Sequence, residues 1–211
     1  MAPVDWPLAI KPLIKKYCRV KHPLNYRNPF ELLVMVVLSA QDSDAHINTI
    51  APSLFQRIPN MAALAKVSQS KLTQFLKGVR NAVKKSKWLI EIGKSIKLDK
   101  NIPSTLDQLV LLPGIGRKSA NVFLRETKRK PEGVIVDLHV VRVAPRIGIA
   151  SGTDPKKIEQ EIMKKLPQKY WDAGMAMSFL GRQICRPKNP KCPECMMKRV
   201  CFYYKNQVPK K

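Results

Sequence analysis

Four of the five cysteines lie close together near the end of the chain and could bind a metal centre. Four thiolates at short intervals can surround one centre, and thiolate ligands favour zinc or an iron–sulfur cluster. Zinc ribbons usually contain two C-x2-C pairs and only one is present here, so the spacing favours a [4Fe–4S] cluster but leaves zinc open. This distribution fits a metal site in a reducing compartment better than a disulfide framework. The candidate ligands are Cys185, Cys192, Cys195 and Cys201, spaced C-x6-C-x2-C-x5-C.

A lysine follows a tight glycine turn in the middle of the chain, where residues 112–118 read LPGIGRK. Two glycines permit a tight turn and let a ligand approach the backbone closely. A helix is expected directly after the turn, and its free N–H groups would bind a DNA phosphate without reading sequence. Lys118 would lie in the first helical turn, at the positive end of the helix dipole, which favours the neutral amine that a Schiff-base nucleophile requires. The predicted DNA contacts in this segment are Gly114, Ile115, Gly116 and Arg117.

An aspartate, Asp137, lies nineteen residues after Lys118, between the apolar residues 134–136 and a predicted helix. Such a residue can be a simple N-cap, just as a lysine in a first turn is usually solvated. His139 could contact a phosphate beside Asp137 or pack between helices. Each residue taken alone therefore has a structural explanation as well as a functional one.

The spacing of apolar residues predicts an all-α fold. Residues 30–38 are apolar nearly all round and are expected to form a buried helix, because no other segment offers a strand for them to pair with. Cys18 is interpreted as a buried apolar residue of the first helix. Further helices are expected at 68–76, 105–111, 117–126, 156–166 and 170–184, with Asp154 and Pro155 starting the helix at 156–166.

The predicted helix at 81–96 is amphipathic. Its apolar side is expected to face the core and its lysines to face solvent. The inward residues are Leu89, Ile92 and Ile96, and the outward ones are Lys84, Lys85, Lys87 and Lys94.

The formal net charge is +24, from 39 Lys and Arg against 15 Asp and Glu. This excess is far greater than solubility requires and indicates a polyanionic partner, with nucleic acid favoured. The sequence contains no apolar segment long enough to span a bilayer and no secretion signal, so we expect no membrane partner and a cytoplasmic location.

Together these segments are similar to the endonuclease III family of the helix-hairpin-helix DNA glycosylase superfamily. No single motif is decisive, but all five in this order are highly specific, and the resemblance covers about residues 30–203. It rests on LSAQDSD at 38–44, LPGIGRK at 112–118, VDLH at 136–139, Gly181–Arg182 and the cysteine spacing.

The resemblance implies two helical domains with the active site in the cleft between them. Residues 23–132 would form a six-helix domain that ends in the helix-hairpin-helix motif. Residues 1–22 and 133–211 would form a discontinuous domain that carries a [4Fe–4S] cluster. By match to the family motifs, Lys118 is the nucleophile, Asp137 the catalytic carboxylate, Gln41 the residue that fills the gap left by the extruded nucleotide, and Cys185, Cys192, Cys195 and Cys201 the cluster ligands.

The implied function is base-excision repair by a bifunctional DNA glycosylase/AP lyase that removes damaged, oxidised pyrimidines through a lysine Schiff base and β-elimination. Its partner would be double-stranded DNA with damaged bases or abasic sites, bound by a monomer in the nucleoid of a prokaryote. Leu138 and Leu180 stand where the family often has Thr and His, which bears on substrate range. Two alternatives are a monofunctional mismatch, uracil or thymine glycosylase of the same superfamily and a non-enzymatic DNA-binding protein with a four-cysteine zinc site.

Overall fold

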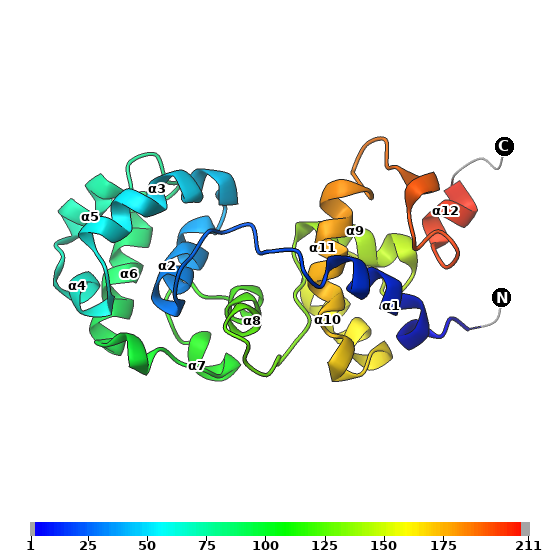
Figure 1. The fold of residues 1–211 in the computed structure, drawn as a ribbon, viewed down its shortest axis with the longest axis horizontal. Helices are drawn as coiled ribbons and strands as arrows, with labels where there is room; N and C mark the ends of the chain where they lie inside the picture. The colour runs from blue at the N-terminus through cyan, green and yellow to red at the C-terminus, as the bar shows by residue number, and fades with distance from the viewer. Residues whose placement is uncertain (1–2, 208–211) are drawn as a thin grey trace. The chain divides into compact units, whose positions relative to one another are not determined.

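The computed structural model describes residues 3–207, and within this range the regular structure is helical throughout. This confirms the predicted all-α class (Figure 1). The chain forms two compact units, one of residues 21–130 and one of residues 1–20 with 131–211. The domain boundaries expected from the sequence, 23–132 for one domain and 1–22 with 133–211 for the other, remain predictions. None of the described helices is long and apolar enough to cross a membrane.

The continuous unit, residues 21–130, contains six helices of six or more residues and one single-turn helix, all within the described range. The last two helices flank the glycine turn. In chain order they are α2 (Pro29–Ser39), α3 (Asp44–Arg57), α4 (Met61–Lys66), α5 (Gln69–Phe75), α6 (Ala82–Ile96), the 3-10 turn η1 (Asp99–Asn101), α7 (Leu106–Leu109) and α8 (Arg117–Glu126).

Helix α2 is the centre of this unit, and the prediction of a buried helix is confirmed. Asn28 caps it by accepting the N–H of Glu31 at 2.9 Å, and Pro29 occupies the first turn. Every residue from 30 to 38 is buried, and the helix packs against α3, α6 and α8. A helix surrounded on all sides needs no polar face, which explains why its residues 32–38 are all apolar, while the buried Glu31 has Arg27 as its partner.

Helix α6 has the predicted apolar face, with Leu89, Ile92 and Ile96 buried. The expectation that Lys85 faces solvent was wrong, because only 1% of its surface is exposed. Its Nζ donates a hydrogen bond of 2.6 Å to the carbonyl of Leu38. The last carbonyls of a helix lack partners within the helix, and this one, at the buried end of α2, finds a donor in the lysine.

The discontinuous unit pairs the start of the chain with its last eighty residues. Helix α1 (Trp6–Tyr17) packs against α11 (Ala173–Gln183) (Figure 1). Between them, the ring of Tyr17 stacks on that of Phe179. The remaining elements of this unit are α9 (Leu138–Ile147), α10 (Pro155–Lys165), η2 (Gln168–Tyr170), η3 (Cys192–Glu194) and α12 (Phe202–Gln207).

Two details of this unit differ from the sequence expectations. Cys18 is exposed rather than buried, because α1 ends at Tyr17 and Cys18 is its C-cap residue. The helix predicted at 170–184 begins later, at Ala173, after the separate turn η2. Asp154 does cap α10 as predicted, accepting the N–H of Lys157 at 2.7 Å.

Gly93 lies where α6 crosses α4, and its replacement tests how closely the two helices pack. In an open helix, Gly→Ala stabilises by about 1 kcal/mol. Here the new Cβ would lie 2.7 Å from the backbone nitrogen of Ala65. Because a backbone cannot rotate away, we expect Gly93→Ala to destabilise the protein by about 1–3 kcal/mol in urea denaturation.

The exposed Ser95 on the same helix supplies the control. Ser95→Ala should change the free energy of unfolding by no more than about 0.5 kcal/mol. A Gly93→Ala protein as stable as the parent would contradict the close approach of α4 and α6.

Candidate active site and cysteine centre

The glycine turn between α7 and α8 is shaped by a side chain from α6. Gly114 has φ +80°, and a Cβ there would lie 2.6 Å from the ring of Trp88. Only glycine satisfies both conditions, because other residues are strained at this φ and would collide with the indole. Ile115 is buried beneath the turn, and its N–H donates to the carbonyl of Leu112 at 3.1 Å. Apolar packing of Trp88 and Ile115 therefore fixes the conformation of the turn.

The first turn of α8 is open. Its N-cap is Gly116, which has no side chain to accept the helix N–H groups, and a Cβ at this position would meet nothing within 4 Å. Arg117 and Lys118 are both exposed in the first turn of the helix. Such a helix terminus can accept an anion on its N–H groups.

The charge of Lys118 acts on a half-buried histidine, His22, of the same unit. Burial lowers the pKa of His22; the carboxylates of Glu126 and Asp44 oppose this shift, whereas the charges of Lys118 and Arg125 add to it. The ring Nδ1 of His22 accepts the N–H of Leu24 at 3.1 Å. His22, whose imidazole is shifted toward its neutral form, and the candidate nucleophile thus belong to the same unit.

Asp137 is the N-cap of α9, and its two carboxylate oxygens have different partners. Oδ1 accepts the N–H groups of His139 and Val140, both at 2.9 Å. Oδ2 accepts the hydroxyl of the buried Ser178 on α11 at 2.5 Å, and a guanidinium nitrogen of Arg182 lies 3.8 Å away. The carboxylate is thus held in one orientation by folding contacts.

Packing against α11 fixes the neighbours of Asp137. A Cβ on Gly174 would lie 2.5 Å from the carbonyl oxygen of Ile135, and one on Gly181 would lie 2.8 Å from Cβ of His139. His139 also contacts Arg142, with 3.2 Å between Nδ1 and Nη2. These contacts support the packing role of His139. Leu138, by contrast, is 85% exposed directly beside Asp137.

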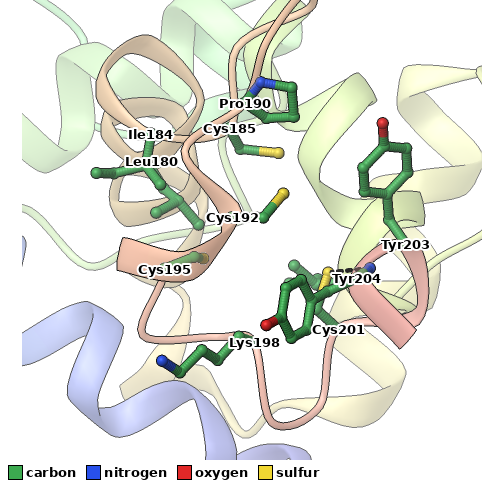
Figure 2. Close-up of a pocket in the computed structure, with 11 residues that line it drawn as sticks. Leu180, Ile184, Cys185, Pro190, Cys192, Cys195, Lys198, Cys201, Tyr203 and Tyr204 are labelled. Carbon is green, nitrogen blue, oxygen red and sulfur yellow. Dashed lines mark hydrogen bonds between the residues drawn. The ribbon is translucent and has the colours of Figure 1, made fainter. Parts of the chain in front are cut away.

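Four thiols surround one cavity at the end of the chain. Its other walls include Ile147, Leu180, Ile184 and Pro190 (Figure 2). Within the described residues, no three His, Cys, Asp or Glu side chains are arranged to hold a single metal ion. The residues that place sulfur on this cavity are Cys185, Cys192, Cys195 and Cys201, and all four are free thiols.

Arg146 joins the two ends of this cysteine loop. Its Nη1 lies 3.6 Å from Sγ of Cys185 and 2.8 Å from the carbonyl of Arg186, while its own carbonyl accepts from Sγ of Cys201 at 3.3 Å. The N–H of Tyr204 points to the same Cys201 sulfur at 3.4 Å. A guanidinium and an N–H aimed at sulfur suit thiolates that carry negative charge.

Burial is the largest influence on the pKa values of three of these thiols. It raises the pKa of Cys195 to about 11, and the neighbouring cysteines add to this effect. Burial also raises the pKa values of Cys192 and Cys201. Binding of a metal centre would release these protons, since thiolates rather than thiols are the ligands. Four sulfurs around a shared cavity, with N–H donors directed at them, fit a polynuclear cluster.

A family model described as the HhH-GPD superfamily of base excision DNA repair proteins matches residues 34–168. The chain is 34% identical over 192 residues to Endonuclease III of Synechocystis sp., covering 90% of this chain and 88% of that protein. It is 36% identical over 182 residues to Endonuclease III of Bacillus subtilis, covering 84% and 83%. The chain belongs to the endonuclease III family.

Solved structures agree with this membership. This endonuclease III family protein superposes on a non-covalent Endonuclease III–DNA complex with a TM-score of 0.86 and 29% identity, covering 99% of this chain and all of the other. A thermostable thymine-DNA glycosylase, 19% identical with a TM-score of 0.80, shares the fold over 95% of this chain and 97% of the other.

Three residues of this family member were not singled out from the sequence. Ser178 lies 41 positions after Asp137, and no local pattern connects them. His22 precedes a proline in a segment without helical periodicity. Asp42 stands inside the 38–44 motif, where a carboxylate before the Ser43 cap of α3 was a visible signal.

Substitutions at Asp137 can separate its structural role from its charge. Asp137→Ala removes the N-cap and the partner of Ser178, and we expect a loss of about 1–2 kcal/mol in the free energy of unfolding. Asp137→Asn keeps an oxygen for the α9 N–H groups, and the Ser178 hydroxyl can turn to accept from the new amide. The asparagine variant should therefore retain most of the stability in urea denaturation.

Asp154 is the matched control, because it caps α10 in the same unit without contacting Ser178. Asp154→Ala should cost about 1 kcal/mol. If Asp137→Asn were as unstable as Asp137→Ala, the carboxylate charge itself would be required for folding.

Proposed function

We propose that this protein is a bifunctional DNA glycosylase and AP lyase that removes damaged, oxidised pyrimidines in base-excision repair. The observation that carries the proposal is the exposed Lys118 in the uncapped first turn of α8, directly after the glycine turn, in a chain of the endonuclease III family. An amine at this place can act as a nucleophile, which a water-based glycosylase does not need.

Duplex DNA would be bound mainly through its phosphates. The charge of +24 supplies affinity that does not depend on sequence, and the first-turn N–H groups of α8, with Gly114 and Gly116, supply a defined phosphate contact. Arg117 would add charge beside that contact, while Ile115 supports the turn from below. His139 is proposed to face the DNA beside Asp137 while packing against α11.

The lesion would leave the base stack before reaction, which costs a few kcal/mol and less for a weakened pair. Gln41 is proposed to occupy the vacancy. The exposed Leu138 offers an apolar contact where the family often has threonine, and so would influence which damaged bases are accepted.

The proposed chemistry uses Lys118 as the nucleophile and Asp137 as the catalytic carboxylate. The Lys118 amine attacks C1′, and the bond from C1′ to the base breaks with its electron pair leaving on the base, which is protonated. C1′ then carries the Lys118 nitrogen and the ring oxygen O4′; the C1′–O4′ bond breaks, O4′ leaves with the electron pair and takes a proton, and C1′ becomes a Schiff base. Loss of a C2′ proton then expels the 3′ phosphate by β-elimination. Asp137 would stabilise positive charge at the sugar and take a proton from Lys118. Its fixed partners keep the carboxylate oriented for this task.

A [4Fe–4S] cluster is proposed as the resident cofactor, held by Cys185, Cys192, Cys195 and Cys201. Support comes from the shared cavity and from the donors of Arg146 and Tyr204 to the sulfurs. The cluster would fix the shape of the 185–201 loop and present its lysines to phosphates. The protein is further proposed to act as a monomer on the DNA of a prokaryotic cell.

Borohydride trapping tests the nucleophile. Reduction of a Schiff base leaves a stable covalent bond, so the parent protein should be trapped on duplexes that carry an oxidised pyrimidine or an abasic site. Lys118→Gln should give no adduct, because its amide cannot form an imine.

The exposed Lys100 lies in the same unit, and its replacement controls for the loss of one positive charge. Lys100→Gln should be trapped like the parent. An adduct with Lys118→Gln, or none with the parent, would refute the lysine mechanism, and base release without trapping would indicate a monofunctional glycosylase.

Colour and metal content test the cofactor. A [4Fe–4S] protein purified without air should be brown, with broad absorbance at about 400 nm and about four iron atoms per chain. Cys195→Ser should lose most of this absorbance, whereas Cys18→Ser should keep it because Cys18 lies outside the cavity. A colourless protein with one zinc per chain would show that the thiols hold zinc.

A further inference from the structure

Two exposed loop residues of the continuous unit share an unusual backbone conformation and touch each other. Gln41 has φ +61° and Asn81 has φ +59°, in the left-handed region that non-glycine residues rarely adopt. The amide nitrogen of Asn81 donates to Oε1 of Gln41 at 3.3 Å. Such conformations cost of order 1 kcal/mol or more each and persist only where the surroundings enforce them. Something must therefore hold both loop tips.

Asp42 connects the two loops through its carboxylate. Oδ2 accepts the backbone N–H of Arg80 at 2.9 Å, 38 residues away in sequence. Oδ1 accepts the N–H of Ser43 and Nδ1 of His46, both at 2.8 Å. One carboxylate thus fixes the residue after Gln41 to the residue before Asn81.

The carboxylate remains charged under all ordinary conditions. Burial alone would raise the pKa of Asp42, but the hydrogen bonds from Arg80, His46 and Ser43 lower it to about 2. Hydrogen bonds to an ionised acceptor are about twice as strong as neutral ones. The N–H of Arg80 therefore donates to a charged acceptor at neutral pH.

Further contacts fix the parts of the chain that lead into each loop. His46 lies against Gly78, where a Cβ would be 3.6 Å from Nε2, and Gly78 with φ +92° begins the turn toward Asn81. On the other side, the buried Lys85 of α6 donates to Leu38 of α2. The start of α6, which follows Asn81, is thus bonded to the end of α2, which precedes Gln41.

We propose that Asp42 is a positioning residue that locks Gln41 and Asn81 into one rigid two-tipped element that enters the DNA as a unit. This inference rests on the proposed function, in which Gln41 fills the vacancy of the extruded nucleotide. Both tips carry carboxamides, which can donate and accept hydrogen bonds at exposed base edges. A preformed element avoids ordering two loops separately when it binds.

The contacts of Asp42 should affect the rate of base release only in duplex DNA, where a nucleotide has to leave the base stack. We would measure single-turnover base release from an oxidised pyrimidine in a duplex and in a single strand. Asp42→Ala should lower the duplex rate about tenfold or more, since it removes hydrogen bonds to a charged group. The single-strand rate should stay within about twofold of the parent, because no vacancy needs to be filled.

Asp42→Asn has the same shape but replaces one acceptor oxygen with a donor, so it cannot serve Arg80, Ser43 and His46 together. It should show the same duplex-selective loss, and it stands in for Asp42→Ala if that variant does not fold. Glu91→Ala removes an exposed carboxylate from α6 and should leave both rates unchanged. Equal losses on the two substrates, or a normal duplex rate in both Asp42 variants, would overturn the proposal.

Amide hydrogen exchange tests the lock without DNA. The N–H of Arg80 should exchange slowly in the parent and about tenfold or more faster in Asp42→Asn. Unchanged exchange would show that Asp42 does not hold the loop. If the parent neither releases bases nor traps on DNA while Arg80 exchange still responds, the proposed function fails but the lock stands.

Discussion

A protein made of many short helices has many helix ends, and each end leaves backbone groups without partners inside the helix. Most of the helices longer than two turns begin at a side chain that accepts these N–H groups, such as Asn28 for α2 and Asp154 for α10. Helix α8 is different, because its N-cap is Gly116. The N–H groups that other helices satisfy internally are left here for a partner. The proposed phosphate contact uses these N–H groups.

Asp137 shows how one folding requirement can orient a reactive group. Its Oδ1 satisfies the start of α9, and its Oδ2 receives Ser178 from α11. These bonds fix both the position and the rotamer of the carboxylate. The close approach of α11, made possible by Gly174 and Gly181, completes the support. A mechanism that needs a directed carboxylate therefore uses one that the fold has already directed.

Local features of the sequence were sufficient to predict the all-α class, the buried α2, the cap of α10 and the family. These properties depend on residue spacing within one segment or on motif order. Lys85 was assigned to the wrong environment because its burial depends on a carbonyl 47 residues away. The pairing of Ser178 with Asp137 is equally non-local. Periodicity identifies which side of a helix is apolar, but it contains no information about unpaired groups on another helix.

The discontinuous unit has a consequence for synthesis of the chain. Helix α1 is synthesised before the unit of residues 21–130, yet its partner α11, which ends at Gln183, follows that unit, and the hydrogen bond between Tyr17 and Gln183 joins the two helices. The unit of residues 21–130 is continuous and can fold as soon as it has emerged. Until α11 has been synthesised, the apolar face of α1, with Trp6, Ile10 and Leu13, lacks the helix against which it packs. The nascent chain therefore exposes this hydrophobic face of α1 while the continuous unit folds and until α11 follows.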